Sequence, residues 1–87
     1  MFDWNKNVKI EISFSEIEGL WAFDNDFEGL KDLHFGVPVI TKNEDGSNRI
    51  VADIPKRKVQ ELERRIKRFN ELVEAFKRPN WKARIMG

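Results

Sequence analysis

Hydrophobic and polar residues alternate near the start of the chain. The segment from Val8 to Phe14 reads VKIEISF, with an apolar residue at every second position. Successive side chains of a β-strand point to opposite faces, so this period of two predicts a half-buried strand.

The spacing changes to threes and fours in the next segment, residues 15–34. Apolar residues stand at positions 14, 17, 20, 21, 27, 30 and 33, which is typical of a helix. Gly19, Gly29 and the polar residues 24–26 interrupt the pattern, so one helix, two short helices or loops all fit. Gly36 and Pro38 predict the end of the segment.

Two segments rich in β-branched residues follow, at 37–41 and 49–54. The intervening KNEDGSN is polar and contains Asp45-Gly46, which predicts a β-hairpin. In the second segment Ile50, Ala52 and Ile54 share one face. Pro38 restricts the first segment to a sheet edge or to the start of its strand.

The strongest periodicity in the chain predicts a long helix over about 55–77. Apolar residues recur at spacings of three and four from Val59 to Phe76, Pro55 suits a first helical turn, and Pro79 prevents continuation. Beyond it Trp81, Ala83 and Ile85 alternate with basic residues, which predicts a last short strand.

The predicted element order is therefore strand, helix, strand, strand, helix, strand. This βαββαβ order is that of the ferredoxin-like α+β fold, and 87 residues suit a single domain spanning 1–87. An antiparallel sheet would be covered by helices on one face and open on the other. If residues 15–34 are loops, the fold reduces to a hairpin and a long helix.

The apolar stripe on the long helix has two interpretations. Its width, with Leu72 beside the main repeat, favours packing on a sheet, whereas its heptad-like spacing also fits an oligomer seam. A helix of about 23 residues would extend beyond strands of about six residues. We therefore expect a homodimer, with an interface formed by Phe69, Val73, Phe76 and Trp81, unless Trp4 or Trp81 covers this surface.

The composition limits the chemistry of the chain. There is no cysteine, so disulfides, thiolate metal sites and cysteine nucleophiles are excluded. No apolar run approaches the length of a membrane span, and the first residues do not resemble a signal peptide. We expect a soluble, cytoplasmic protein without a membrane partner.

Charge is unevenly distributed along the chain. Residues 1–55 carry a net charge of −6 and residues 56–87 a net charge of +7. Lys56, Arg57 and Lys58 would lie at a helix N-terminus, where the helix dipole disfavours cations. A cluster that breaks this rule is a candidate site for binding an anion, such as an acidic protein surface. The alternative is that the acidic first half of the chain neutralises the cluster.

A nucleic acid is the alternative partner for the basic half of the chain. Its contacts would come from residues 56–58 together with five further basic positions: Arg64, Arg68, Arg78, Lys82 and Arg84. An isoelectric point near 8.0 and an acidic first half are weak support for this class. The predicted third strand, NRIVADI, also lacks the aromatic residues that stack on RNA bases in related topologies.

The segment DNDFEGLKDLHF resembles a calcium loop only in part. Asp24, Asp26 and Glu28 occupy the first three ligand positions, but Phe35 replaces the bidentate glutamate at position 12. We therefore expect no calcium site, and instead a polar turn in which Asp24 or Asp26 caps a short helix. His34 is the only histidine, and no nucleophile or phosphate-loop motif accompanies it. We expect no catalysis, metal or cofactor.

These patterns together predict a small non-catalytic regulatory or interaction protein. Its main activity would be protein–protein binding, through an open sheet face, a sheet edge or the ends of the long helix. Nucleic-acid binding is the alternative function.

Overall fold

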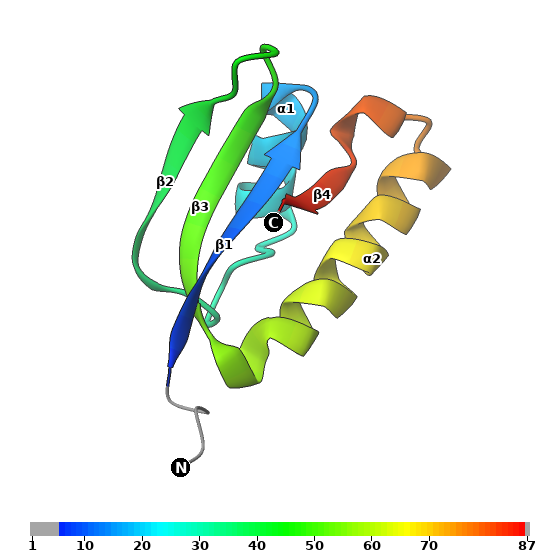
Figure 1. Ribbon diagram of the computed structural model, residues 1–87. Coiled ribbons are helices and arrows are strands. Elements are labelled where there is room, and N and C mark those ends of the chain that lie inside the picture. The colour runs from blue at the N-terminus through cyan, green and yellow to red at the C-terminus, as the bar shows by residue number, and fades with distance from the viewer. Residues whose placement is uncertain (1–5, 87) are drawn as a thin grey trace.

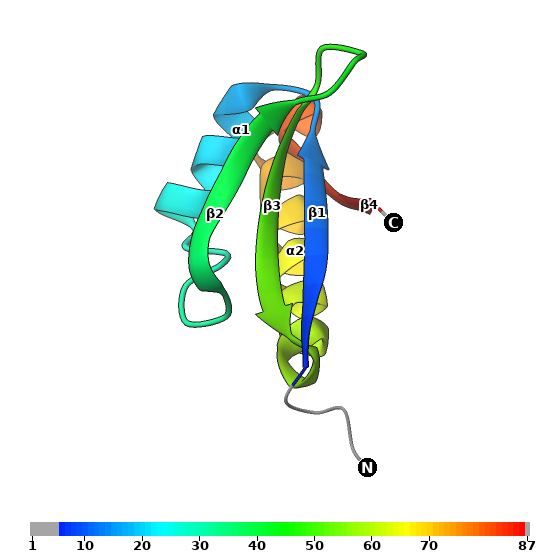
Figure 2. The same ribbon diagram turned by 60° about the vertical axis from the view of Figure 1, so that its left-hand side comes forward.

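The computed structural model describes residues 6–86 and has an α+β architecture (Figure 1). Four strands form one antiparallel sheet in the order β2-β3-β1-β4. Their bounds are Asn7–Phe14 (β1), Phe35–Lys42 (β2), Asn48–Pro55 (β3) and Ala83–Met86 (β4). The two α-helices, α1 (Ile17–Trp21) and α2 (Val59–Ala75), lie on the same side of the sheet (Figure 2).

The predicted alternation in the strands is confirmed. Ile12 and Phe14 of β1 are buried beneath the helices, and so are Ile50, Ala52 and Ile54 of β3. The residues between them, such as Glu11 and Asp53, lie on the uncovered face, where Arg49 pairs with Glu11 at 3.5 Å. The sheet is therefore apolar on the helical side and polar or mixed on the other.

Residues 15–34 form two short helical pieces followed by turns. The α-helix α1 continues directly into η2, a π-helical turn at Ala22–Asp26. A Cβ at Gly19 would lie 2.6 Å from the Cα of Trp81, and a Cβ at Gly29 would lie 2.2 Å from the Phe23 ring. Both glycines therefore allow close packing that a residue with a Cβ would prevent. This role adds to the interruption of the helical pattern that the sequence showed.

The β2–β3 hairpin is confirmed, and Pro38 lies in an edge strand as predicted. The amide of Asn43 donates to Ser47 at 2.7 Å, so the alternation of an antiparallel ladder directs the amides of Thr41 and Val39 toward β3. The backbone nitrogen of Pro38 then points away from β3. Its missing N–H therefore costs no hydrogen bond of the ladder. The pairing is irregular between Phe35 and Val39, which further limits pairing along this edge.

The long helix is shorter than predicted. Pro55 ends β3, residues Lys56–Lys58 form a 3₁₀ turn (η3), and α2 occupies 17 residues, Val59–Ala75. At about 1.5 Å per residue α2 measures about 26 Å. The eight-residue strands β1 and β3 have a similar length of about 27 Å. The expectation that the helix extends far beyond the sheet is therefore wrong.

The chain returns from α2 to the sheet through a second 3₁₀ turn, η4 (Pro79–Trp81). Trp81 lies in this turn, and not in the last strand as predicted. The Asn70 side chain of α2 holds β4 in place, because its amide group donates to the Ala83 carbonyl at 2.9 Å and accepts from the Ala83 amide at 2.7 Å. Asn70 thus substitutes for a strand partner at the start of β4.

Candidate functional site

The end of α2 is a tight turn that exposes an aromatic side chain. The amide of Arg78 donates to the Val73 carbonyl at 2.7 Å, and the amide of Lys77 donates to the Glu74 carbonyl at 3.0 Å. With Lys77 in the left-handed region, at φ 59°, this is a Schellman motif. The turn leaves Phe76 at the surface, with 73% of its area exposed.

An apolar groove of about 470 Å³ lies beside Phe76. It runs between the end of α2, the η4 turn and the η2 turn. The groove is lined by Ala22, Asp26, Phe27, Phe69, Leu72, Val73, Phe76, Arg78 and Trp81. A concave apolar surface with few charged groups is typical of a site that buries an apolar group of a partner.

All four residues predicted for the interface line this groove, but in different ways. Phe69 and Val73 are buried, with exposed fractions of 3% and 5%. The expectation that these two side chains are uncovered in a single chain is therefore wrong, because both belong to the buried core of the fold. Phe76 is exposed as predicted, and Trp81 is half-buried in the groove wall.

The floor of the groove is a cluster of aromatic rings. Phe69 makes edge-to-face contacts with Phe23 and Phe27 at centroid distances of 5.1 and 5.4 Å. Phe14 approaches Phe69 at 6.4 Å in the same geometry. Edge-to-face pairs of this kind stabilise the packing of the rings, so the base of the groove is part of the core.

Two opposite charges flank the groove. Asp26 belongs to the η2 side, and Arg78 follows the end of α2. The guanidinium of Arg78 lies over the Trp81 ring, 5.3 Å from its centroid, which is a cation–π arrangement. A guanidinium that stacks on an aromatic ring can still pair through its edge with a carboxylate.

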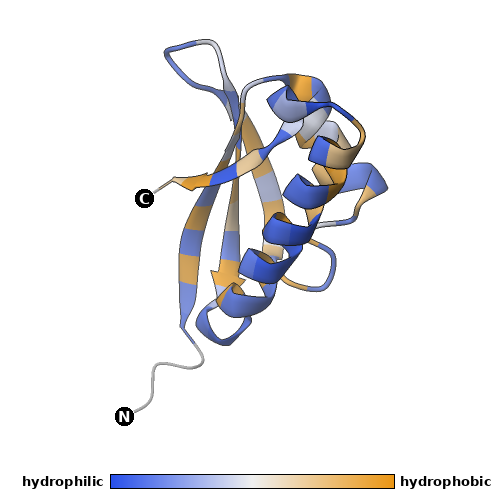
Figure 3. Cartoon of the chain, turned by 90° about the vertical axis from the view of Figure 1, so that its right-hand side faces the viewer, coloured by the Kyte–Doolittle hydropathy of each residue, from blue (hydrophilic) through white to orange (hydrophobic). Residues whose placement is uncertain are grey.

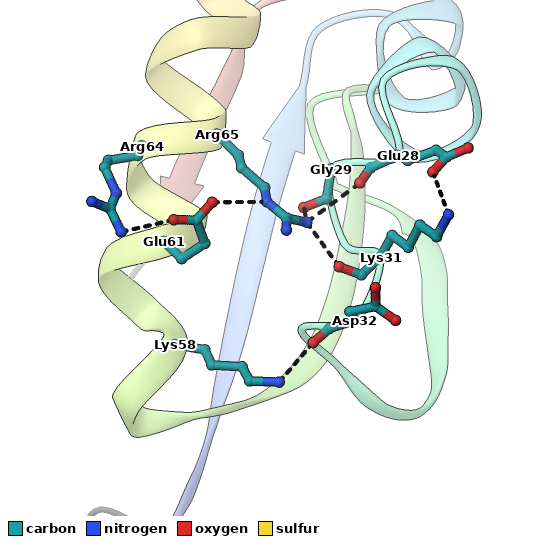
Figure 4. Close-up of polar contacts among 8 residues, drawn as sticks. All are labelled: Glu28, Gly29, Lys31, Asp32, Lys58, Glu61, Arg64 and Arg65. Atoms are coloured by element: carbon teal, nitrogen blue, oxygen red, sulfur yellow. Dashed lines mark hydrogen bonds and ion pairs between the residues drawn. The ribbon is translucent and has the colours of Figure 1, made fainter.

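The predicted anion site at residues 56–58 is partly used within the fold. The Lys58 ammonium donates to the Asp32 carbonyl at 2.7 Å (Figure 4). Lys58 therefore has a structural partner, which sequence analysis did not identify. Lys56 and Arg57 are exposed in the 3₁₀ turn before α2, and anion binding by residues 56–58 stays a prediction.

Arg65 makes a similar contact about two helical turns further along the chain. Its guanidinium donates to the carbonyls of Gly29 at 3.3 Å and Lys31 at 2.8 Å, and its Nε donates to Glu61 (Figure 4). Arg65 and Lys58 together attach the 28–33 turns to α2. Neither contact was predicted from the sequence, because each joins residues that are far apart in the chain.

The remaining predicted basic residues belong to different elements, and some of them pair with glutamates of the chain. Arg64 pairs with Glu61 at 2.7 Å on the outer face of α2, and Lys82 pairs with Glu74 at 3.3 Å near η4. Arg84 lies in β4, opposite Ser13, while Arg68 is exposed on α2. The outward face of α2 is hydrophilic along its length (Figure 3), with glutamates between the basic residues. This arrangement is typical of a solvated helix face.

The acidic segment that resembles part of a calcium loop has a structural role. Asp24 and Asp26 lie in the η2 turn, and Glu28 pairs with Lys31 at 3.1 Å. Leu30 and Leu33 of the same segment are buried in the core. Within residues 6–86, His, Cys, Asp and Glu side chains form no group of three or more that could hold a metal ion. The predicted helix cap by Asp24 or Asp26 is wrong, since neither precedes a helix.

His34 makes a local contact. Its Nδ1 donates to the Gly36 carbonyl at 2.9 Å, which supports the sharp turn into β2. Trp4, which was proposed as one of two tryptophans that could cover the stripe on the long helix, lies outside the described residues.

Several groove residues were not identified from the sequence. Asp26, Phe27 and Ala22 reach the groove only because η2 continues α1 toward the end of α2. Leu72 was recognised as widening the apolar stripe, and its exposed fraction of 37% places it at the edge of that stripe.

Comparison of the chain with protein-family models, with curated proteins and with solved structures gives no significant match. Within the described residues, no helix has both the length and the apolar character needed to cross a membrane.

Proposed function

We propose that this chain is a small non-catalytic interaction protein that binds another protein through the groove at the end of α2. The observation that carries this proposal is the exposure of Phe76 beside an apolar groove. Aromatic side chains next to a well-packed pocket often contribute most of the binding energy of an interface. A regulatory role follows if this contact changes the activity of the partner.

The ferredoxin-like interpretation of the fold belongs to the same proposal. The strand order β2-β3-β1-β4, with a helical segment in each crossover, supports it. In this arrangement both helices pack on one face, and the groove forms where the second crossover meets the first. The lack of cysteine suits a reducing compartment, and we propose a cytoplasmic location.

The dispersed basic residues favour a protein partner over a nucleic acid. A nucleic-acid surface needs a continuous basic strip along the phosphate backbone. Here Lys58, Arg64 and Lys82 have partners within the chain. An anionic contact at Lys56 and Arg57 would then add to the groove contact by accelerating association with an acidic protein surface.

Photo-crosslinking tests the proposed function. Benzoylphenylalanine in place of Phe76 keeps an aromatic ring at the groove, and the same residue in place of Gln60 lies on the outer face of α2 as a matched control. In extract of the source cells we expect covalent adducts with protein from position 76 and few from position 60. Equal adduct yields at both positions would contradict the proposal, and loss of the adducts after nuclease treatment would favour a nucleic acid.

A further inference from the structure

The groove carries features that a second copy of the same chain would match. It presents a protruding aromatic ring, Phe76, beside a hollow lined by Leu72 and Trp81. A two-fold axis placed at such a surface lets each ring enter the hollow of the other chain. Interfaces of this kind use the same patch on both subunits.

The charges at the groove also suit contact with a second copy of the chain. Asp26 and Arg78 are both exposed and carry opposite charges on opposite sides of the groove. In a two-fold dimer, residue i contacts residue j and j contacts i, so each Asp26 would meet the Arg78 of the other chain. Two ion pairs would then frame the apolar contact, which gives the association a defined orientation.

We propose that the groove binds a second copy of this chain, in a two-fold dimer with Phe76 inserted across the axis and Asp26 paired with Arg78. This inference rests on the proposed function, because it names the partner of the same groove. The sheet edges are weaker candidates for self-association, since β2 carries Pro38 and an irregular pairing, and β4 has only four residues.

A charge-exchange experiment tests the dimer. We expect the purified protein to sediment with twice the mass of the 10.3 kDa chain. Asp26→Arg alone and Arg78→Asp alone should each raise the dimer dissociation constant at least about tenfold, because like charges then face each other. An equimolar mixture of the two variants should form a heterodimer, because each contact again joins a carboxylate and a guanidinium.

Two further variants keep the test independent of misfolding. Phe76→Glu changes an exposed side chain and should abolish the dimer with an unchanged circular dichroism spectrum. Glu71→Arg, on the side of α2 away from the groove, should leave the dimer intact.

Two results would overturn the dimer. One is a monomeric wild-type protein at millimolar concentration, and the other is a mixture of folded charge variants that stays monomeric. If either result is obtained while position 76 still forms adducts with other proteins, the dimer is overturned and the proposed function stands. The proposed function itself fails when position 76 gives no more adduct than position 60.

Discussion

Replacing Gly19 by alanine tests how closely α1 packs against the η4 turn. Alanine ordinarily stabilises a helix relative to glycine by about 1 kcal/mol. Here the added Cβ would lie 2.6 Å from the Trp81 Cα and 2.9 Å from its carbonyl oxygen, and backbone atoms cannot move aside cheaply. We expect Gly19→Ala to lower the free energy of unfolding by about 1–3 kcal/mol, measured by urea denaturation. Glu18→Ala, at an exposed position of the same helix, should change it by less than about 0.5 kcal/mol.

Asp45 gives a prediction for acidic pH. The Ser47 hydroxyl and the Ser47 amide both donate to its carboxylate, and these bonds hold the pKa of Asp45 below its ordinary value of 3.8. A lowered pKa in the folded state means that the carboxylate stabilises the hairpin loop above pH 3.8, and that this contribution is lost as the pH falls through the lower folded value. NMR titration should show the low midpoint, and Ser47→Ala should raise it. An unchanged midpoint in that variant would contradict the assignment.

At the scale of elements, Arg65 tests the attachment of the 28–33 turns to α2. Arg65→Ala removes hydrogen bonds to the carbonyls of Gly29 and Lys31. We expect a loss of about 1–2 kcal/mol in the free energy of unfolding and faster amide hydrogen exchange in the turns. Arg64→Ala is the matched control, because Arg64 shares the partner Glu61 but is exposed on the outer face. Equal losses in the two variants would show that the carbonyl contacts contribute nothing.

The Schellman turn at the end of α2 gives a second prediction at this scale. Lys77 has a φ of 59°, a conformation that costs a non-glycine residue about 1 kcal/mol. Lys77→Gly should therefore raise the melting temperature, although glycine normally destabilises helices. Lys67→Gly, in the middle of α2, should lower the melting temperature by a comparable amount. A fall in both variants would indicate that the turn is not formed in solution.

At the scale of the whole molecule, Phe69 within α2 and Phe76 at the C-cap of α2 should behave differently. Phe69 packs among the rings of Phe14, Phe23 and Phe27, whereas 73% of Phe76 is exposed. Phe69→Ala should lower the free energy of unfolding by about 3–5 kcal/mol. Phe76→Ala should change it by less than about 0.5 kcal/mol when measured on dissociated chains. Similar losses at dilute concentration would contradict the division between core and groove.

The sequence by itself determined the strands, the hairpin and the existence of α2. These features depend on neighbouring residues: the alternation in VKIEISF fixes which face is buried, Asp45-Gly46 permits the turn, and the stripe from Val59 to Val73 covers the sheet. Such patterns are local, so they can be recognised without knowledge of distant contacts. The same locality explains why the four groove residues on and after α2 were predicted together.

Only the tertiary structure decided which of those residues are covered and where the helix ends. Phe69 and Phe76 have equivalent places in the repeat, yet only Phe69 meets the aromatic rings of β1 and η2. Lys58 and Arg65 donate hydrogen bonds to carbonyl groups that are 26 and 34 residues away in the chain. These two basic residues therefore have a structural role. Burial and pairing depend on groups that are distant in the chain, and the free energy of those contacts is defined only once the sheet and helices have come together.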